Sequence, residues 1–378
     1  MRILVLGAGL QGSACAFDLL ETSDADVTLA DRDSSRVPPF LKPHVGKRLT
    51  LATVDGRDEA SLRRVIDGHS AVLSALPYYL NAEAARLAIE AGAHFADLGG
   101  NTEIVRRQES FDADAVRRGV SVVPDCGVAP GMVNILAVEA MRRLDSVTSV
   151  RLYVGGLPQK PRPPLNYNIV YSLEGVLDYY TTPSWILRGG KTAQVEALSE
   201  LEEIRFTGIG SLEAFHTAGG ISTMPWTYGG KIRTMEYKTL RYPGHAEIIG
   251  AIRQLGLFDV EPVDVKGQRV APRDVFVAVV DPHLRRADPD LIALRVVVEG
   301  KRGSRKMKLG FELLDRADTR QGVSAMMRTT GYSLSITGQL QMAGKTAGPG
   351  VKVSYLAVPF EPYVSALAKR GIKIRELK

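Results

Sequence analysis

A glycine-rich turn near the start of the chain constrains its fold more than any other feature. An apolar run of strand length, RILVL (residues 2–6), leads directly into GAGLQG (7–12), and the residues that follow have the spacing of a helix with one buried face. Glycine spacing alone is a weak indication. Here Asp31 ends a second apolar run about 20 positions later, which is typical of a dinucleotide-binding βαβ unit. The chain is therefore predicted to begin with a Rossmann fold.

Each glycine of this turn has a physical role in the predicted cofactor site. Gly7 permits the tight turn, Gly9 lets the backbone approach a pyrophosphate, and Gly12 lets the helix pack close to the sheet. The helix N-terminus offers N–H groups and a partial positive charge to the phosphates. Asp31 can accept hydrogen bonds from ribose hydroxyls, which favours NAD, although Arg32 beside it would suit the 2′-phosphate of NADP. The alternative is a glycine-rich turn that binds nothing.

Strand-like and helix-like runs alternate through the first third of the chain. SAVLSALP (70–77) has the character of a buried strand and NAEAARLAIEAG (81–92) that of a helix, with a short connection between them. This alternation predicts a doubly wound parallel α/β sheet, whose ligands lie outside the carboxyl ends of the strands. The residues predicted to bind the cofactor are Gly7, Gly9, Leu10, Gln11, Gly12, Asp31, Arg32, Asp55, Ala75, Leu76 and Pro77.

The pattern changes in the second part of the chain. Strand-like runs such as SVRLYVGG (149–156) dominate and helical runs are sparser, which indicates an α+β domain built on a large, partly antiparallel sheet. We therefore predict a Rossmann domain over residues 1–127 and a substrate-binding domain over 128–321. Residues 322–378 are predicted to pack back on the first domain.

Composition and charge exclude several classes of function. The chain has 378 residues and a net charge of +6, and no Lys/Arg block is dense enough to indicate nucleic-acid binding. The longest apolar runs are strand-sized, and the N-terminus lacks the pattern of a secretory signal. Cys15 and Cys126 lie far apart, and no Cys/His cluster or HExxH motif occurs. We expect a cytoplasmic protein of two domains, without a metal and without nucleic-acid or membrane partners.

The stretch KTLRYPGH (238–245) places two cations, a tyrosine and a histidine around a Pro-Gly turn. The planar guanidinium of Arg241 suits a carboxylate, and His245 at a helix start is suited to accept a proton near neutral pH. Lys238 would act as a base only if burial lowered its pKa. From the residue types alone, a solvated basic loop is the default interpretation.

Three motifs of the second part resemble the saccharopine dehydrogenase (reductase-type) family: GGLPQKPRPPLNYNIVYSLEGVL (155–177), KTLRYPGH (238–245) and DCGVAPGM (125–132). The resemblance extends over most of the chain, including TTGYSLSITGQL (329–340), and is strongest to L-lysine 6-dehydrogenases. It implies an NAD(P)-dependent enzyme that interconverts a C–N single bond and an imine, usually as a dimer through the second domain. Saccharopine-forming members read GLDPG where this chain reads GVAPG, so Ala129 replaces an acidic residue, which suits a smaller substrate such as lysine.

The resemblance implies oxidation of the lysine ε-amine by hydride transfer to nicotinamide. Addition of water and loss of ammonia would leave the semialdehyde, which cyclises to piperideine carboxylate. Asp97 and Asp125 follow two predicted strands and would stabilise the iminium or orient water, or would simply cap turns. The predicted catalytic residues are Asp97, Asp125 and His245, and the predicted substrate residues are Tyr78, Lys160, Asn166, Lys238 and Arg241.

Two other functions stay open from the sequence. One is a reductase that joins an aldehyde and an amine, as in saccharopine or carboxyspermidine-type synthesis, although Ala129 speaks against the saccharopine version. The other is a catalytically silent NAD-binding dimer, because a fold does not fix a function. In each case the expected partners are a small molecule and a second copy of the chain.

Overall fold

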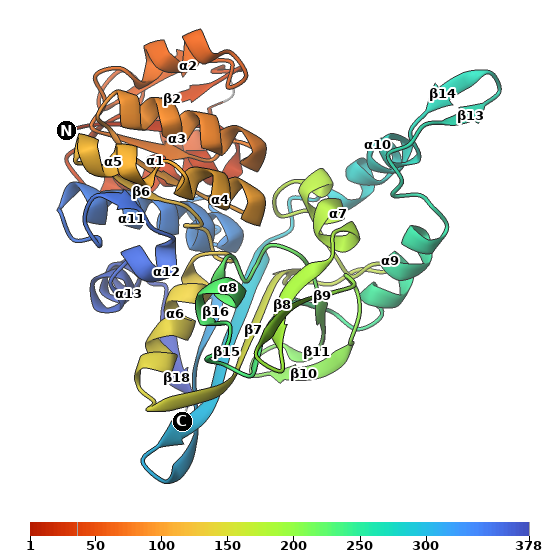
Figure 1. The fold of residues 1–378 in the computed structure, drawn as a ribbon. Helices are drawn as coiled ribbons and strands as arrows, with labels where there is room; N and C mark the ends of the chain where they lie inside the picture. The colour runs from red at the N-terminus through yellow and green to blue at the C-terminus, as the bar shows by residue number, and fades with distance from the viewer. Residues whose placement is uncertain (36, 378) are drawn as a thin grey trace.

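The structure is a computed structural model that describes residues 1–35 and 37–377. Its N-terminal part is a seven-stranded sheet with the order β17-β6-β5-β4-β1-β2-β3 (Figure 1), in which every pair is parallel. The strands are β1 (Arg2–Leu6), β2 (Asp26–Asp31), β3 (Leu49–Thr53), β4 (Ala71–Ser74), β5 (His94–Asp97), β6 (Ser121–Val123) and β17 (Gly350–Val351). The strand order reverses between β1 and β4, which confirms the predicted doubly wound sheet and places a crevice at the carboxyl ends of these strands.

Helices cover both faces of this sheet, which explains why β1 is apolar throughout. The helices are α1 (Leu10–Thr22), α2 (Glu59–Ile66), α3 (Asn81–Glu90), α4 (Thr102–Glu109), α5 (Asp112–Arg118) and α11 (Tyr332–Met342), with the 3-10 turns η1 (Pro39–His44) and η2 (Tyr78–Leu80). Ile3 and Val5 pack in the same core as α1 and α11, whereas Leu4 and Leu6 pack in the core of α2 and α3. A strand that is buried on both faces needs no polar alternation.

The second part is built on a nine-stranded mixed sheet, as predicted. Its strands are β7 (Ser146–Pro158), β8 (Ser184–Arg188), β9 (Lys191–Val195), β10 (Glu202–Phe206), β11 (Gly210–His216), β12 (Thr234–Arg241), β15 (Asp290–Arg302), β16 (Arg305–Arg316) and β18 (Ile374–Leu377). The main path runs β10-β11-β12-β7-β15-β16-β18, and β8 pairs with β12 and β9. The β12–β7 pair is parallel and the other pairs are antiparallel.

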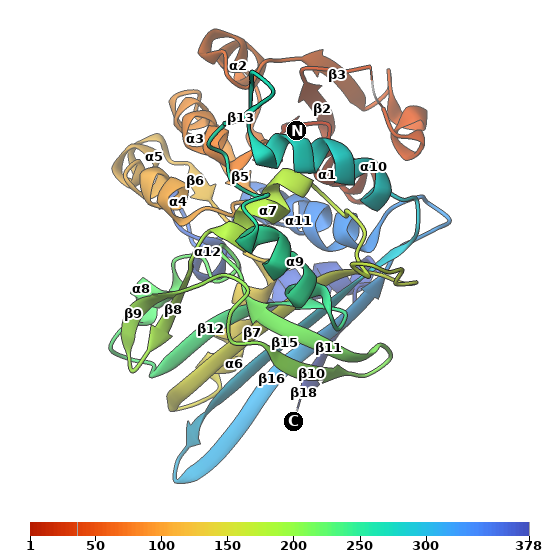
Figure 2. The same cartoon turned by 90° about the vertical axis from the view of Figure 1, so that its right-hand side faces the viewer.

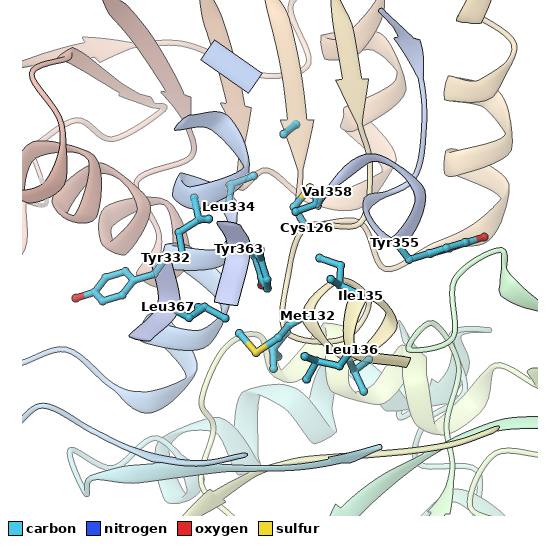
Figure 3. Packing of buried hydrophobic residues seen from close by; sticks show 14 of the residues in the cluster. Cys126, Met132, Ile135, Leu136, Tyr332, Leu334, Tyr355, Val358, Tyr363 and Leu367 are labelled. Atoms are coloured by element: carbon cyan, nitrogen blue, oxygen red, sulfur yellow. The ribbon is translucent and has the colours of Figure 1, made fainter. Parts of the chain in front are cut away.

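One apolar core joins the two parts. The elements between the sheets are α6 (Met132–Arg142), α8 (Met224–Tyr228), η3 (Met327–Gly331), α12 (Ser354–Ala357) and α13 (Phe360–Lys369). Figure 3 shows Met132 and Leu136 of α6 beside Tyr363 and Leu367 of α13, and the same cluster continues into both sheets. At Gly331 a methyl group would lie 2.6 Å from the carbonyl oxygen of Gln11, so only glycine lets η3 approach α1 this closely.

The remaining helices lie on the side of the second sheet that faces the N-terminal part, or project from it. These are α7 (Leu173–Thr181), α9 (His245–Gln254) and α10 (Pro272–Leu284), with the hairpin β13 (Val263–Val265) and β14 (Gln268–Val270). Figure 1 shows the hairpin and α10 extending away from the body of the molecule as an arm, which in Figure 2 lies in front of the body, on the side that faces the viewer. Within residues 1–35 and 37–377, no helix combines the length and the apolar character needed to cross a bilayer.

The segment after residue 322 contributes to both parts of the molecule. Helix α11 packs on α1, β4 and β5, and β17 extends the N-terminal sheet. Strand β18 instead pairs antiparallel with β16 in the second sheet. The predicted packing of 322–378 on the first domain therefore describes α11 and β17 but not the last residues, because the chain crosses back after α13.

Candidate active site

A cleft opens between the carboxyl ends of the N-terminal strands and the second sheet. Gln11 of α1 and residues 98–99 and 127–130 line it from the N-terminal side. Strands β7 and β12 and helix α7 line it from the other side, with the tyrosines Tyr171, Tyr179, Tyr180 and Tyr237. Of the described residues in this lining, Arg241 alone carries a charge. The cleft is therefore an aromatic, mostly neutral chamber with a single cation.

Arg241 is buried without a carboxylate partner. Its side chain is 5% exposed, and its guanidinium lies 4.8 Å from the ring centroid of Tyr167. The Nε donates to the Tyr180 hydroxyl at 3.0 Å, and Nη1 donates to the Leu240 carbonyl at 2.9 Å. Among the described residues no ion pair involves Arg241, and a buried cation without a counter-ion is costly. A carboxylate bound in the cleft would supply that counter-ion.

The predicted role of His245 as a base near neutral pH is wrong. The ring is 1% exposed, and burial, followed by the charge of Arg241, lowers its pKa to about 3. Its Nδ1 lies 3.0 Å from the carbonyl oxygen of Leu165, and its Nε2 lies 3.0 Å from the Tyr180 hydroxyl. His245 is thus neutral at pH 7, with both nitrogens occupied by protein groups.

Lys238 does not reach the cleft. Tyr237, Thr239 and Arg241 line the cleft from alternate positions of β12, so Lys238 points to the opposite face of the sheet. There its Nζ lies 2.9 Å from Glu202 and donates to the Glu200 carbonyl at 2.7 Å. The predicted substrate role of Lys238 is therefore wrong, and period-two alternation in the predicted strand is the signal that would have excluded it.

Lys160 and Asn166 also lie outside the lining of the cleft, so their contact with substrate stays a prediction that the cleft geometry does not support. Lys160 is exposed, and the backbone of Asn166 bonds locally to the Arg162 carbonyl at 3.0 Å. The loop that carries them contributes the Leu165 carbonyl to His245 instead. Tyr78 is half-buried, and the nearby charges of Asp178 and Arg273 place its hydroxyl beside the second part of the molecule.

Asp97 and Asp125 are buried beneath the cleft rather than in its lining. Asp97 accepts hydrogen bonds from the Gly99 backbone at 2.7 Å and from the Gln108 amide at 2.6 Å. Asp125 accepts one from the Gly100 backbone at 3.3 Å and a short one from the Ser222 hydroxyl. Both carboxylates therefore shape the turn after β5, in line with the alternative that they organise turns.

Burial raises the pKa of both carboxyl groups. The pKa of Asp97 rises to about 6 and that of Asp125 to about 7, and the charge of Asp97 contributes to the latter. The turn packs so closely that a methyl group at Gly99 would fall 1.7 Å from Asp125 Oδ1, and one at Gly100 would lie 2.7 Å from the Tyr179 hydroxyl. The turn after β5 is therefore packed between the Asp125 carboxylate and the Tyr179 hydroxyl.

The glycine-rich turn has the geometry of a cofactor cradle. Gly7 has φ +93°, and a methyl group at Gly12 would fall 1.8 Å from the Gly7 carbonyl oxygen, so the fold itself requires both glycines. Gly9 differs, because its φ is −66° and a methyl group there would meet no protein atom within 4 Å. Gly9 is the N-cap of α1, where glycine is preferred over alanine, and the open space in front of it would admit a ligand close to the backbone.

The other predicted cofactor residues surround this turn or the strands next to it. Asp31 accepts a hydrogen bond from the Ala8 backbone at 2.7 Å, which fixes its carboxylate beside the turn. Arg32, Asp55 and Pro77 are exposed, whereas Leu10 and Gln11 begin α1. The Gln11 carboxamide is buried without a hydrogen-bond partner among the described residues, and it lines the cleft. Ala75 and Leu76 follow β4, and the Ala75 carbonyl packs against Gly7.

The tyrosines of the cleft were not predicted, except for Tyr78 at its margin. Tyr171, Tyr179 and Tyr180 come from one stretch, YSLEGVLDYY, which ends on α7. Their helical spacing is as typical of core packing as of a ligand site, so the sequence offers no signal that separates the two. A further group, Glu200, His216 and Glu236, has metal-ligand chemistry, but arginines pair with both glutamates and the group does not line the cleft.

Known proteins resemble both parts of the chain. Residues 127–372 match the saccharopine dehydrogenase C-terminal domain, and residues 3–123 match the saccharopine dehydrogenase NADP binding domain. Saccharopine dehydrogenase [NADP(+), L-glutamate-forming] of Saccharomyces cerevisiae is 22% identical over 99% of this chain and 98% of that protein. The mitochondrial alpha-aminoadipic semialdehyde synthase of Mus musculus is 27% identical over 69% of this chain, which spans only 29% of that protein.

Two solved structures share the fold. Apo saccharopine dehydrogenase (L-Glu forming) from Saccharomyces cerevisiae superposes with a TM-score of 0.81 at 19% identity, over 100% of both chains. Homospermidine synthase from Legionella pneumophila in complex with NAD superposes with a TM-score of 0.71 at 11% identity, over 100% of this chain and 91% of that one. The match to the NADP binding domain, which includes the glycine-rich turn, supports a nicotinamide cofactor.

A methyl group at Gly9 should separate cofactor binding from folding. Gly9→Ala is expected to lower the melting temperature of the cofactor-free protein much less than Gly12→Ala does, because alanine is only a poorer N-cap, and to weaken NADH binding by about tenfold or more, since the methyl group occupies ligand space. Thermal unfolding and an NADH fluorescence titration measure the two effects. Gly12→Ala is the matched control, which should lose stability because its methyl group meets the Gly7 carbonyl. A stable Gly9→Ala variant with normal NADH affinity would contradict the cradle.

The raised pKa of Asp125 predicts how stability changes with pH. The folded-state pKa of about 7 lies above the ordinary value of 3.8, so the folded protein binds more protons between these limits. The free energy of unfolding should therefore fall as pH rises from about 4 to about 7, by on the order of 4 kcal/mol from this group. Asp125→Asn should flatten that part of the profile, measured by urea unfolding at pH 5 and pH 8. A variant with the wild-type slope would refute the assignment.

Proposed function

The chain belongs to the saccharopine dehydrogenase family, and on that premise we propose that it oxidises the ε-amine of L-lysine to the semialdehyde with NAD. The observation that carries this proposal is the charge of the cleft. Arg241 is the single cation among the described lining residues, and no acidic side chain shares that lining. Such a cleft matches a substrate with one carboxylate.

The same observation argues against saccharopine as substrate. Saccharopine carries three carboxylates, and each one that is buried without a cation or a set of hydrogen bonds costs several kcal/mol. Ala129 supports this distinction, because it lines the cleft at the position where saccharopine-forming members carry an acidic residue. The names of the relatives favour a reductase that joins an aldehyde and an amine, which is therefore the second candidate.

The cleft residues supply binding, orientation and exclusion of water. The nicotinamide cofactor, when bound, accepts the hydride that leaves C6 of lysine. Arg241 would hold the α-carboxylate and so place the ε-carbon at the opposite end of the cleft, towards Gln11 and residues 127–130. The rings of Tyr179 and Tyr237 would face the positive charge that develops on nitrogen, which aromatic faces stabilise. Val154, Val176 and Met326 complete an apolar wall that keeps water from the reacting carbon.

NAD rather than NADP is part of the proposal. Asp31 ends β2 with its carboxylate held beside the turn, where it would accept ribose hydroxyls and repel a 2′-phosphate. Arg32 is exposed and next in sequence, so it could offset that repulsion. Asp31→Ala is the variant that would weaken NAD most.

We further propose that the arm of α10 and the β13–β14 hairpin docks on a second copy of the chain. Val263 and Val265 of β13 are 50% and 51% exposed, and Val275 and Val279 are 48% and 58% exposed one helical turn apart on α10. A lone two-stranded hairpin is marginally stable, so an apolar arm of this kind gains stability when a partner covers it. The segment also carries both signs of charge, which suits a self-complementary two-fold contact.

Turnover with a panel of amines tests the proposed function. Purified protein with NAD or NADP is expected to reduce NAD with L-lysine, and not with ornithine, arginine or saccharopine, followed by absorbance of the reduced cofactor. Arg241→Ala should raise KM for lysine by about 100-fold with a smaller effect on kcat, because a charge-assisted carboxylate contact is lost. Turnover that requires an aldehyde, an amine and reduced cofactor would favour the reductase. Cofactor binding without any turnover would favour the catalytically silent NAD-binding dimer.

The oligomeric state tests the docking of the arm. The wild-type protein is expected to elute as a dimer in light-scattering chromatography, and the Val275→Glu/Val279→Glu double variant as a monomer, because two buried carboxylates would oppose the contact. The matched control is Leu201→Glu, a change to an equally exposed apolar residue outside the arm. A wild-type monomer, or a dimer in both variants, would show that the arm is not the interface.

A further inference from the structure

We propose that Tyr180 and His245 are positioning residues, which hold the Arg241 guanidinium in one orientation for the carboxylate of the substrate. The proposal rests on the amino acid substrate proposed above, and extends it to two residues that orient Arg241: Tyr180, which also lines the cleft, and His245, which does not. Tyr180 comes from α7 and His245 from the first position of α9, so the hydrogen bond between them also joins these two helices.

Hydrogen bonds link the Leu165 carbonyl, His245, Tyr180 and Arg241 in series, and the carbonyl fixes the donor and the acceptor of each bond. The Leu165 carbonyl can only accept, so Nδ1 of His245 carries the proton and donates across 3.0 Å. The unprotonated Nε2 must then accept from the Tyr180 hydroxyl, 3.0 Å away. With its proton committed to His245, the Tyr180 oxygen accepts from Nε of Arg241, also at 3.0 Å. The backbone carbonyl thus sets the donors and acceptors as far as the guanidinium.

The result is a guanidinium with two of its five N–H donors occupied. Nε donates to Tyr180 and one N–H of Nη1 donates to the Leu240 carbonyl. Arg241 has five N–H donors, and none of its hydrogen bonds among the described residues uses Nη2. Since Arg241 lines the cleft, its remaining donors suit a bidentate contact with a carboxylate.

Aromatic packing immobilises the hydrogen-bonded series from the Leu165 carbonyl through His245 and Tyr180 to Arg241, which we call the relay. His245 stacks on Phe215 with an interplanar angle of 4° and meets the edges of Tyr167 and Tyr180 at centroid distances of 5.4 and 5.7 Å. His245 itself does not line the cleft, so its contribution to binding passes through Tyr180. A side chain that is already immobilised loses little rotamer freedom when the ligand binds.

Removing one hydroxyl group tests the relay with a matched control. Tyr180→Phe removes only the central donor and acceptor, whereas Tyr167→Phe removes a hydroxyl that is buried without a hydrogen-bond partner in the described chain. His245→Phe deletes both polar atoms and keeps a ring, and His245→Gln keeps one donor and one acceptor. Each full-length variant, saturated with NAD and checked by thermal unfolding, is titrated calorimetrically with L-norleucine or n-pentylamine, which differ in the α-carboxylate.

Tyr180→Phe and His245→Phe are expected to weaken L-norleucine binding roughly tenfold and to leave n-pentylamine unchanged. His245→Gln should recover most of that loss, and Tyr167→Phe should bind both probes as the wild type does. Equal losses for both probes, no loss in Tyr180→Phe, or no L-norleucine binding by the wild type would each overturn the proposal. The expected pattern in a protein that turns over no lysine would uphold the relay and refute only the proposed function.

Discussion

The cleft exists because one apolar core holds two sheets at a fixed distance. Helix α6 packs against β7, β15 and β16 on one side, and the residues of α11 and α13 meet it from the other, so the carboxyl ends of the N-terminal strands face β12. Neither sheet could form the cleft alone, since the glycine-rich turn lies on one and Arg241 on the other. The close approach at Gly331, where η3 passes over α1, belongs to the same constraint.

The buried ionisable groups near the cleft differ in whether protein groups satisfy them. Asp97 and Asp125 are buried under the turn after β5, where backbone N–H groups and the Ser222 hydroxyl satisfy them and burial raises the pKa of each. Arg241 is buried in the lining itself and has aromatic neighbours but no carboxylate. The first two charges shape the protein, and the third is left for a ligand. This asymmetry is what the proposed amino acid oxidation depends on.

The family relationship and the cleft limit the function from opposite directions. The family supplies a nicotinamide-binding fold and a chemistry at carbon–nitrogen bonds, and its relatives in yeast and mouse are a saccharopine dehydrogenase and an alpha-aminoadipic semialdehyde synthase. The cleft of this chain offers a single cation, an alanine at position 129 and a wall of tyrosines. A small substrate with one carboxylate meets both limits, because it leaves no second anion to bury.

The sequence by itself determined the Rossmann fold, the glycine-rich turn and the mixed second sheet, because hydrophobic periodicity and backbone freedom are local properties. Family motifs also located Arg241, whose place on the cleft face of β12 agrees with the predicted carboxylate contact. Only the tertiary structure decided where Lys238 and His245 point. Lys238 lies on the face of β12 that is turned away from the cleft, and the ring of His245 is buried between the Leu165 carbonyl and Tyr180. The tyrosines that line the cleft could not be predicted from the sequence either. The environment of a side chain depends on residues that are distant in sequence, whereas its type and spacing do not.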